Sequence, residues 1–214
     1  MIFISFNENT PKTRTSLLEL RNKRKIASFG LEILKDKEDA LLSEFLEVIK
    51  QAKNARTHLS NNLSLGSNAL ARAENWLGPN NTESIAASTT PQKNILVDEK
   101  NIMGTTVPKI STKNLKRDLF ARGYNLHDTT ESIDTAADFF ETSLDYALRV
   151  GEEETSAQIL AEQITNTRTK TNALEKIIIP EIFNNEKKIR ANLNETERQE
   201  TAKIKRIKKI LKKT

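Results

Sequence analysis

The stretch that decides the fold runs from Leu17 to Leu59 and reads LLELRNKRKIASFGLEILKDKEDALLSEFLEVIKQAKNARTHL. A three–four spacing runs through it without a break, and eleven of its thirteen seam positions are apolar. Such a spacing places the apolar side chains on one stripe of a helix, which is typical of a coiled coil. The seam positions we expect to pack most closely are Leu20, Leu31, Leu34, Leu41, Phe45 and Val48. The pattern predicts one helix from Pro11 to about Asn62.

The composition agrees with an elongated helical protein better than with a compact globule. The chain has 214 residues, of which 36% are hydrophobic and 29% charged. An ordinary globular chain is roughly 45–50% apolar, whereas a two-helix seam needs only about two apolar residues in seven. The absence of cysteine excludes disulfide scaffolds and thiol catalysis. No apolar run reaches the roughly 18 residues of a membrane span.

Helical periodicity returns near residue 129 and continues to the C-terminus, with an expected weak point at Gly151. Three later seam positions are Leu174, Ile178 and Ile182. Pro180 lies between the last two. It lacks a backbone N–H and is expected to bend the helix.

The region between the two helices reads as a small central domain. Residues 68–77 predict a short helix and 78–92 a polar loop. Two β-prone runs, 95–97 and 105–107, flank Gly104 and predict a hairpin. The chain offers little to bury the apolar side chains of this hairpin, so we expect them to contact a partner protein: Ile95, Val97, Ile102, Met103 and Val107.

These elements predict a mainly α protein. Segments 11–62 and 129–214 form a long antiparallel two-helix coiled coil, and residues 63–128 form a small domain with short helices and a hairpin. If the helices pair end to end, residue 17 lies near 210 and residue 59 near 168. Residues 12–25 hold six basic side chains and residues 201–214 hold seven. The pairing would gather both clusters at one basic tip, represented by Arg14, Arg21, Arg24, Lys205, Arg206, Lys208 and Lys209.

Three stretches resemble the D subunits in the central stalk of V-type and A-type rotary ATPases. The first spans 14–50 and contains Leu34-Lys35-Asp36-Lys37; the second is KNIMGTTVPKI at 100–110. The third spans 164–182 and contains Asn172-Ala173-Leu174-Glu175 and Ile179-Pro180. One departure is Lys12, which separates Pro11 from the Thr-Arg pair that usually follows it directly in that family.

The resemblance implies a rotor shaft without catalytic residues, cofactor or metal. In that family the two terminal helices stand inside a ring of catalytic A and B subunits, and the basic tip would enter that ring. The middle domain meets the small F subunit of the stalk. It also meets the C or d subunit, which sits on the membrane rotor. The implied location is peripheral, on the cytoplasmic side of a membrane, with no membrane span.

A second function remains open from the residues alone. A basic coiled coil could be a scaffold, or could bind nucleic acid through its phosphates, in a strongly salt-dependent way. Aromatic side chains for base stacking are scarce near the expected tip, and no base-reading motif is visible. The two histidines, His58 and His127, lack the spacing of a metal pair.

Overall fold

A computed structural model describes residues 11–90, 95–112, 115–125 and 129–211. The helices are α1 (Arg14–Leu77), α2 (Pro79–Ser88), α3 (Glu131–Ala173) and α4 (Ile179–Leu211). The strands are β1 (Ile95–Ile102) and β2 (Thr105–Thr112), and two short turns are η1 (Leu119–Ala121) and η2 (Leu174–Ile178). The chain forms two compact units, residues 1–39 with 165–214 and residues 40–164. The mainly α fold with a central hairpin is confirmed.

In the first unit the start of α1 packs against α4. Its core consists of Leu20, Ile182 and Ile189, flanked by Leu17, Ala27 and Leu193. The two helices run in opposite directions, because early residues of α1 contact late residues of α4. Ion pairs along this contact join Arg14 to Glu197 at 2.6 Å and Lys35 to Glu175 at 2.8 Å.

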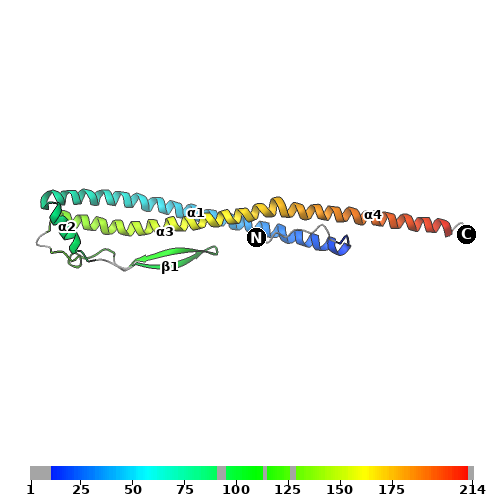
Figure 1. Ribbon diagram of the computed structural model, residues 1–214, viewed down its shortest axis with the longest axis horizontal. Helices are drawn as coiled ribbons and strands as arrows, with labels where there is room; N and C mark the ends of the chain where they lie inside the picture. The colour runs from blue at the N-terminus through cyan, green and yellow to red at the C-terminus, as the bar shows by residue number, and fades with distance from the viewer. Residues whose placement is uncertain (1–10, 91–94, 113–114, 126–128, 212–214) are drawn as a thin grey trace. The chain divides into compact units, whose positions relative to one another are not determined.

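In the second unit the rest of α1 packs against α3, and the hairpin lies beside these helices (Figure 1). Leu41 and Val48 of α1, Leu160 of α3 and Val107 of β2 form its buried core. Leu41 and Leu160 are fully buried. The hairpin therefore supplies one wall of this core and does not project away from it.

The register of the helix pair differs from the prediction. The prediction placed residue 17 near 210, but Arg14 meets Glu197 at 2.6 Å. It placed residue 59 near 168, but Arg56 meets Glu154 at 2.9 Å. End-to-end matching of two apolar patterns could not locate this register. The actual pairing leaves the last residues of α4 beyond the start of α1, where α4 extends past the α1 start in Figure 1.

The first helix is longer than predicted and continues through Gly66 to Leu77. Gly66 is buried, and a Cβ placed there would lie 3.3 Å from Cβ of Phe139 and 3.5 Å from the Phe140 ring. The glycine at this position thus allows α3 to approach α1 closely. Gly151, the expected weak point, lies inside the continuous helix α3.

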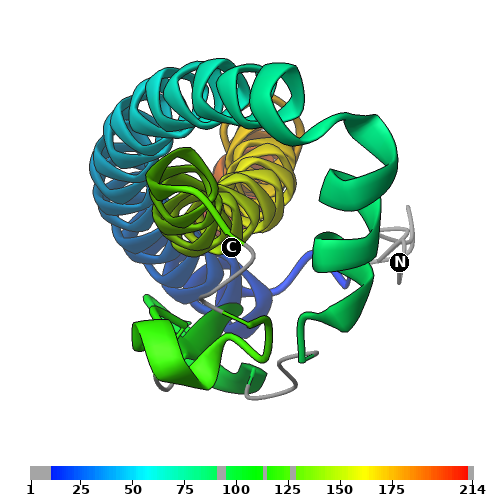
Figure 2. The same ribbon diagram turned by 90° about the vertical axis from the view of Figure 1, so that its left-hand side faces the viewer.

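The polar segment after Leu77 is partly helical, contrary to the predicted loop. Helix α2 begins at Pro79, a residue suited to the first helical position, after Gly78 turns the chain with φ 78°. The Thr82 hydroxyl donates to the Gly78 carbonyl at 2.7 Å. Viewed from the end in Figure 2, α2 runs from the end of α1 and stands beside the α1–α3 pair.

The hairpin is confirmed, with strands longer than the two runs that predicted it. Antiparallel pairing extends from Ile95 opposite Thr112 to Ile102 opposite Thr105. Met103 and Gly104 form the two-residue turn, with φ 50° and 80°. Positive φ at both positions matches the twist of the strands, and glycine adopts it without steric cost.

The helix around Pro180 changes its hydrogen-bond pattern. Residues 174–178 form a π-helical turn, in which the Ile179 N–H donates to the Leu174 carbonyl. A π turn uses more residues than an α turn, so it shifts the phase of the seam. Leu174 is half-buried and Ile182 is buried, but Ile178 is 37% exposed and lies outside the seam, contrary to the prediction. A bend at Pro180 itself stays a prediction.

Alanine substitutions at Leu41 and at its neighbour Leu42 test which face of α1 is buried in the second unit. Leu41 is fully buried, whereas Leu42 is 44% exposed. We expect Leu41→Ala to lower the free energy of unfolding by about 2–5 kcal/mol through a cavity, and Leu42→Ala by less than about 1 kcal/mol. Urea unfolding followed by circular dichroism measures both. Equal losses for the two variants would show that α1 presents a different face to α3.

Candidate functional site

The basic residues at the start of α1 are held by acids of α4. Both oxygens of the Glu186 carboxylate are used: Arg21 Nε donates to Oε1 at 3.2 Å, and Arg24 Nη1 lies 3.1 Å from Oε2. Arg14 contacts Glu197 at 2.6 Å. Three of the seven predicted tip residues are therefore neutralised within the chain, and they serve the α1–α4 contact.

The other four predicted tip residues lie on a different stretch of helix. Residues 194–211 of α4 are all exposed, and they include Lys205, Arg206, Lys208 and Lys209. We call residues 198–211 the α4 extension, because they follow Glu197, which pairs with the first residue of α1. The two basic clusters do not converge side by side, contrary to the prediction. The charge available to a partner is concentrated on the α4 extension.

The predicted partner-contact residues of the hairpin divide between two environments. Val107 is 2% exposed, and Ile102 packs against the same core. The prediction that the chain could not bury these two side chains is wrong, because the hairpin lies on α1 and α3. Ile95, Val97 and Met103 are 43%, 67% and 53% exposed. We call these three and Leu96, which is 54% exposed and points to the opposite face of β1 from Ile95 and Val97, the apolar hairpin surface.

An acidic crevice separates the hairpin from the helices. Its lining includes Glu44, Glu47, Lys100, Glu152 and Glu153. Glu152 accepts a hydrogen bond from the Ile110 N–H at 3.0 Å, which satisfies the outer edge of β2. Burial and the adjacent Glu152 charge raise the pKa of Glu153, and Lys100 lowers it in part. The hydrogen bond from Ile110 to Glu152 therefore holds β2 against α3.

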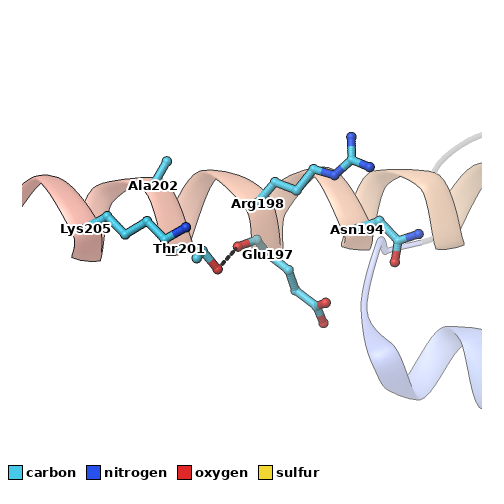
Figure 3. A pocket seen from close by; sticks show the side chains of 6 residues that line it. All are labelled: Asn194, Glu197, Arg198, Thr201, Ala202 and Lys205. Atoms are coloured by element: carbon cyan, nitrogen blue, oxygen red, sulfur yellow. Dashed lines mark hydrogen bonds between the residues drawn. The ribbon is translucent and has the colours of Figure 1, made fainter.

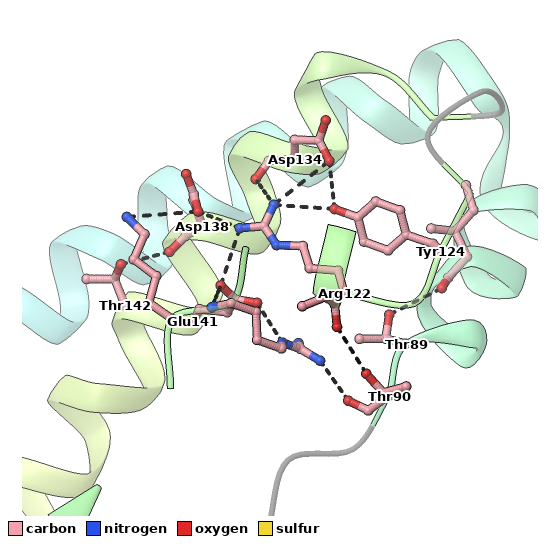
Figure 4. A network of polar contacts seen from close by, with 12 residues as sticks. Thr89, Thr90, Arg122, Tyr124, Asp134, Asp138, Glu141 and Thr142 are labelled. Atoms are coloured by element: carbon pink, nitrogen blue, oxygen red, sulfur yellow. Dashed lines mark hydrogen bonds and ion pairs between the residues drawn. The ribbon is translucent and has the colours of Figure 1, made fainter. Parts of the chain in front are cut away.

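A polar network anchors the rest of the central region to α3 (Figure 4). Its centre is Arg122, which is 2% exposed. Arg122 Nη2 contacts Asp138 at 2.5 Å and Glu141 at 3.3 Å, and its Nη1 donates to the Asp134 carbonyl at 3.2 Å. The Tyr124 hydroxyl donates to the Asp134 carboxylate at 2.6 Å.

A second arginine extends the network to the end of α2. Arg117 Nε donates to Glu141 at 2.9 Å, and Arg117 Nη1 donates to the Thr90 carbonyl at 2.7 Å. The Thr90 N–H donates to the Arg122 carbonyl at 3.3 Å. Three segments distant in sequence are thus joined through a few charged side chains.

The network shifts the pKa of two of its members, Arg122 and Tyr124. Burial opposes the charged form of Arg122, but hydrogen bonds to Tyr124, Glu141 and Asp138 outweigh it and raise the pKa. Burial and the hydrogen bond to Asp134 raise the pKa of Tyr124. Sequence reasoning missed this cluster. The available signal was a pair of arginines in an irregular segment and acids spaced three and four apart on the next helix.

The described residues hold no cluster of metal-ligating side chains. No group of three or more His, Asp or Glu side chains among them could hold a metal ion. His58 stacks on Tyr146 with ring centroids 5.3 Å apart, and His127 lies outside the described residues. Across the described helices, none is both long and apolar enough to cross a bilayer.

Comparison with known proteins gives one consistent result. A family model that describes the D subunits of ATP synthases matches residues 16–209. The chain belongs to this family of ATP synthase D subunits. The D subunit of the A-type ATP synthase from Pyrococcus horikoshii is 39% identical over 199 residues, covering 93% of each chain. The D subunit from Thermococcus kodakarensis is 36% identical, covering 95% of each chain. The one from Methanobrevibacter smithii is 34% identical, covering 94% of this chain and 87% of the relative.

Methionine substitutions at Arg122 and at Lys116 test whether the polar network anchors residues 115–125 to α3. Arg122→Met removes the arginine that joins Asp138 to Glu141 and leaves Glu141, which is 7% exposed, paired with Arg117 alone, whereas the Lys116 side chain is 69% exposed. Removing one partner of a buried ion pair costs about 3–5 kcal/mol. We expect amides of residues 115–125 to exchange far faster in Arg122→Met, and at nearly the wild-type rate in Lys116→Met. Equal exchange rates in the two variants would contradict the anchoring role.

Proposed function

We propose that this chain is the rotating central shaft of an A-type or V-type ATPase complex. It transmits torque between nucleotide chemistry in a catalytic ring and ion movement through a membrane rotor. The chain itself is non-catalytic, and its complex lies on the cytoplasmic side of a membrane. The observation that carries the proposal is the family membership, together with two long antiparallel helices whose pairing is locked by ion pairs.

Mechanical stiffness favours this role. One helix twists and bends easily, whereas a packed seam makes the two helices deform together. In the first unit, the pairs Arg14–Glu197, Arg21–Glu186 and Lys35–Glu175 cross the seam at separate levels. Sliding of one helix along the other would break all of them at once. We propose that the π turn and Pro180 make this element asymmetric, so that it presses unequally on the proteins of the ring.

We propose that the α4 extension is the part of the shaft that contacts the ring of A and B subunits. Its charged residues Lys205, Arg206, Lys208 and Lys209 are exposed. Arg14, Arg21 and Arg24 contribute less, because acids of α4 already neutralise them. Charge on a rotating surface suits a contact that must be remade at each step, since exposed ion pairs are individually weak.

We propose that the apolar hairpin surface binds the small F subunit of the stalk. Ile95 and Val97 lie on one face of β1 and Leu96 on the other, and Met103 is exposed at the turn; exposed apolar side chains that gather in this way mark protein contacts. Two exposed aromatic side chains in the second unit, Trp76 at 84% and Phe120 at 88%, are candidates for the contact with the C or d subunit.

The α4 extension distinguishes the shaft from a nucleic-acid-binding protein. Replacing Lys205, Arg206, Lys208 and Lys209 by glutamine removes four positive charges. We expect the affinity for an A–B ring to fall at least about tenfold, with little binding of either protein to duplex DNA at physiological salt. Titration against ring and DNA in parallel measures this. DNA binding that exceeds ring binding and falls steeply with salt would overturn the shaft proposal.

The hairpin offers a separate test of the stalk contact. Val97→Ser combined with Met103→Ser removes two exposed apolar side chains and leaves the buried Val107 in place. We expect the affinity for the small F subunit to fall at least about tenfold, with the unfolding midpoint unchanged. The matched control is Glu99→Gln on the same exposed strand. Affinity that is unaltered in the double variant would place this stalk contact elsewhere.

A further inference from the structure

The helix pair of the first unit contains a stretch, described throughout, in which no apolar side chain is buried. In α1, none of the described residues 21–39 is buried, although Leu20 just before them is. Among the described residues 165–181 of the returning chain, the only buried ones are Thr167 and Thr171, at 6% and 5% exposed. We call residues 21–39 and 165–181 the polar stretch. Much less buried apolar surface holds its two helices together than holds the neighbouring cluster of the same unit.

Ion pairs take the place of apolar contacts in the polar stretch. Lys35 Nζ donates to the Glu175 carboxylate at 2.8 Å, with both side chains about half exposed. Arg168 Nε lies 3.6 Å from the Glu38 carboxylate, and the Arg168 side chain is 73% exposed. The hydrogen bond from Lys35 lowers the pKa of Glu175, so this carboxylate stays charged. Because exposed ion pairs add little stability and break and re-form in water, they align the two helices without closing them firmly.

The backbone of the polar stretch is also weakened, in both of its helices. A Cβ placed on Gly30 would meet nothing within 4 Å, so packing does not require the glycine, which weakens a helix relative to alanine. The hydroxyls of Ser28 and Thr171 each donate to the carbonyl four residues before them, at 2.9 and 3.0 Å. Back-bonding of this kind destabilises and bends helices. The π turn at residues 174–178 is a further site at which helices bend.

The division of the chain into two compact units falls at the edge of the polar stretch, between residues 39 and 40 and between residues 164 and 165. Helical regions with few buried apolar contacts open at a smaller free-energy cost than a packed core. The polar seam, the unneeded glycine, the back-bonding hydroxyls and the π turn therefore weaken the helix pair at one level.

We propose that the polar stretch is a flexible joint, at which the paired helices bend and separate locally while the apolar cluster of Leu20, Ile182 and Ile189 stays closed. The joint confines deformation of the helix pair to one level. This inference goes beyond the shaft function and is tested on the isolated full-length chain, so either proposal can fail without the other.

Hydrogen exchange on the wild-type chain tests the local opening. Residues 182–193 provide the internal reference, because they lie in the same helix pair and include the buried Ile182 and Ile189. We expect amides of residues 165–178 to exchange at least about tenfold faster than those of the reference segment. Equal exchange rates in the two segments would overturn the proposal.

A triple variant tests the cause of the opening. Gly30→Ala fills open space, and Thr167→Val with Thr171→Val keeps the side-chain shape while replacing two buried hydroxyls by methyl groups. We expect exchange in the polar stretch to slow at least about fivefold, because alanine stiffens the helix and the valines add buried apolar surface. The rate of residues 182–193 should not change. Unaltered exchange in the polar stretch would contradict the proposal.

The matched control carries the same kinds of change outside the polar stretch, Gly151→Ala with Thr201→Val. Gly151 also has nothing within 4 Å of a Cβ, and the Thr201 hydroxyl donates to the Glu197 carbonyl at 2.8 Å (Figure 3). We expect the control to leave exchange in the polar stretch unaltered, because its opening is local. Equal slowing by the control and the triple variant would show that these amides exchange through global unfolding, and the joint would be ruled out.

Spin-label distances test the bending, because the natural chain contains no cysteine. Leu18→Cys with Leu42→Cys places labels at exposed sites of α1 on either side of the polar stretch. The control pair, Leu42→Cys with Leu65→Cys, spans a similar length of α1 outside it. We expect the first distance distribution to be at least about twice as wide as the control, and to narrow in the triple variant. Equal widths for the two label pairs would contradict a joint in α1.

Discussion

The structure depends on one constraint, the burial of the apolar stripe of α1. An amphipathic helix of this length exposes its stripe to water unless a second helix runs along it. Leu20 is covered by Ile182 and Ile189 in one unit, and Leu41 and Val48 by Leu160 and Val107 in the other. Because the covering helices belong to the same chain, α1 must pair with a segment that returns in the opposite direction. The central region follows from this requirement, since it turns the chain around.

The sequence was sufficient for features that follow from local chemistry. The three–four spacing of α1 and the hairpin turn around Gly104 both appear in the structure, although α1 runs on to Leu77, past its predicted end near Asn62. The register of the helix pair was not accessible, because coiled-coil stripes can slide by whole heptads with little change in apolar burial. Ion pairs such as Lys35–Glu175 select among these registers, and they are visible only once both helices are placed.

The errors share a physical origin in long-range packing. The first helix was predicted to end near Asn62, but it continues through Gly66, where Phe139 and Phe140 approach α1. Val107 reads as an orphan apolar residue, but it completes the core beside Leu160. The Arg122 network joins residues scattered between Thr90 and Glu141 and has no periodic signature. In each case the deciding neighbour lies on another element, at least 12 residues away in the sequence.

The shaft proposal depends on where the exposed basic side chains lie. Acids of α4 pair with Arg14, Arg21 and Arg24 at the start of α1, whereas Lys205, Arg206, Lys208 and Lys209 of the α4 extension are exposed. The most direct measurement of the shaft proposal links Lys208→Cys to a cysteine in one of the A subunits of the assembled complex. The account predicts that oxidation stops steady-state ATP turnover and that reduction restores it, because a linked shaft cannot rotate. Undiminished turnover in the linked complex would contradict the account.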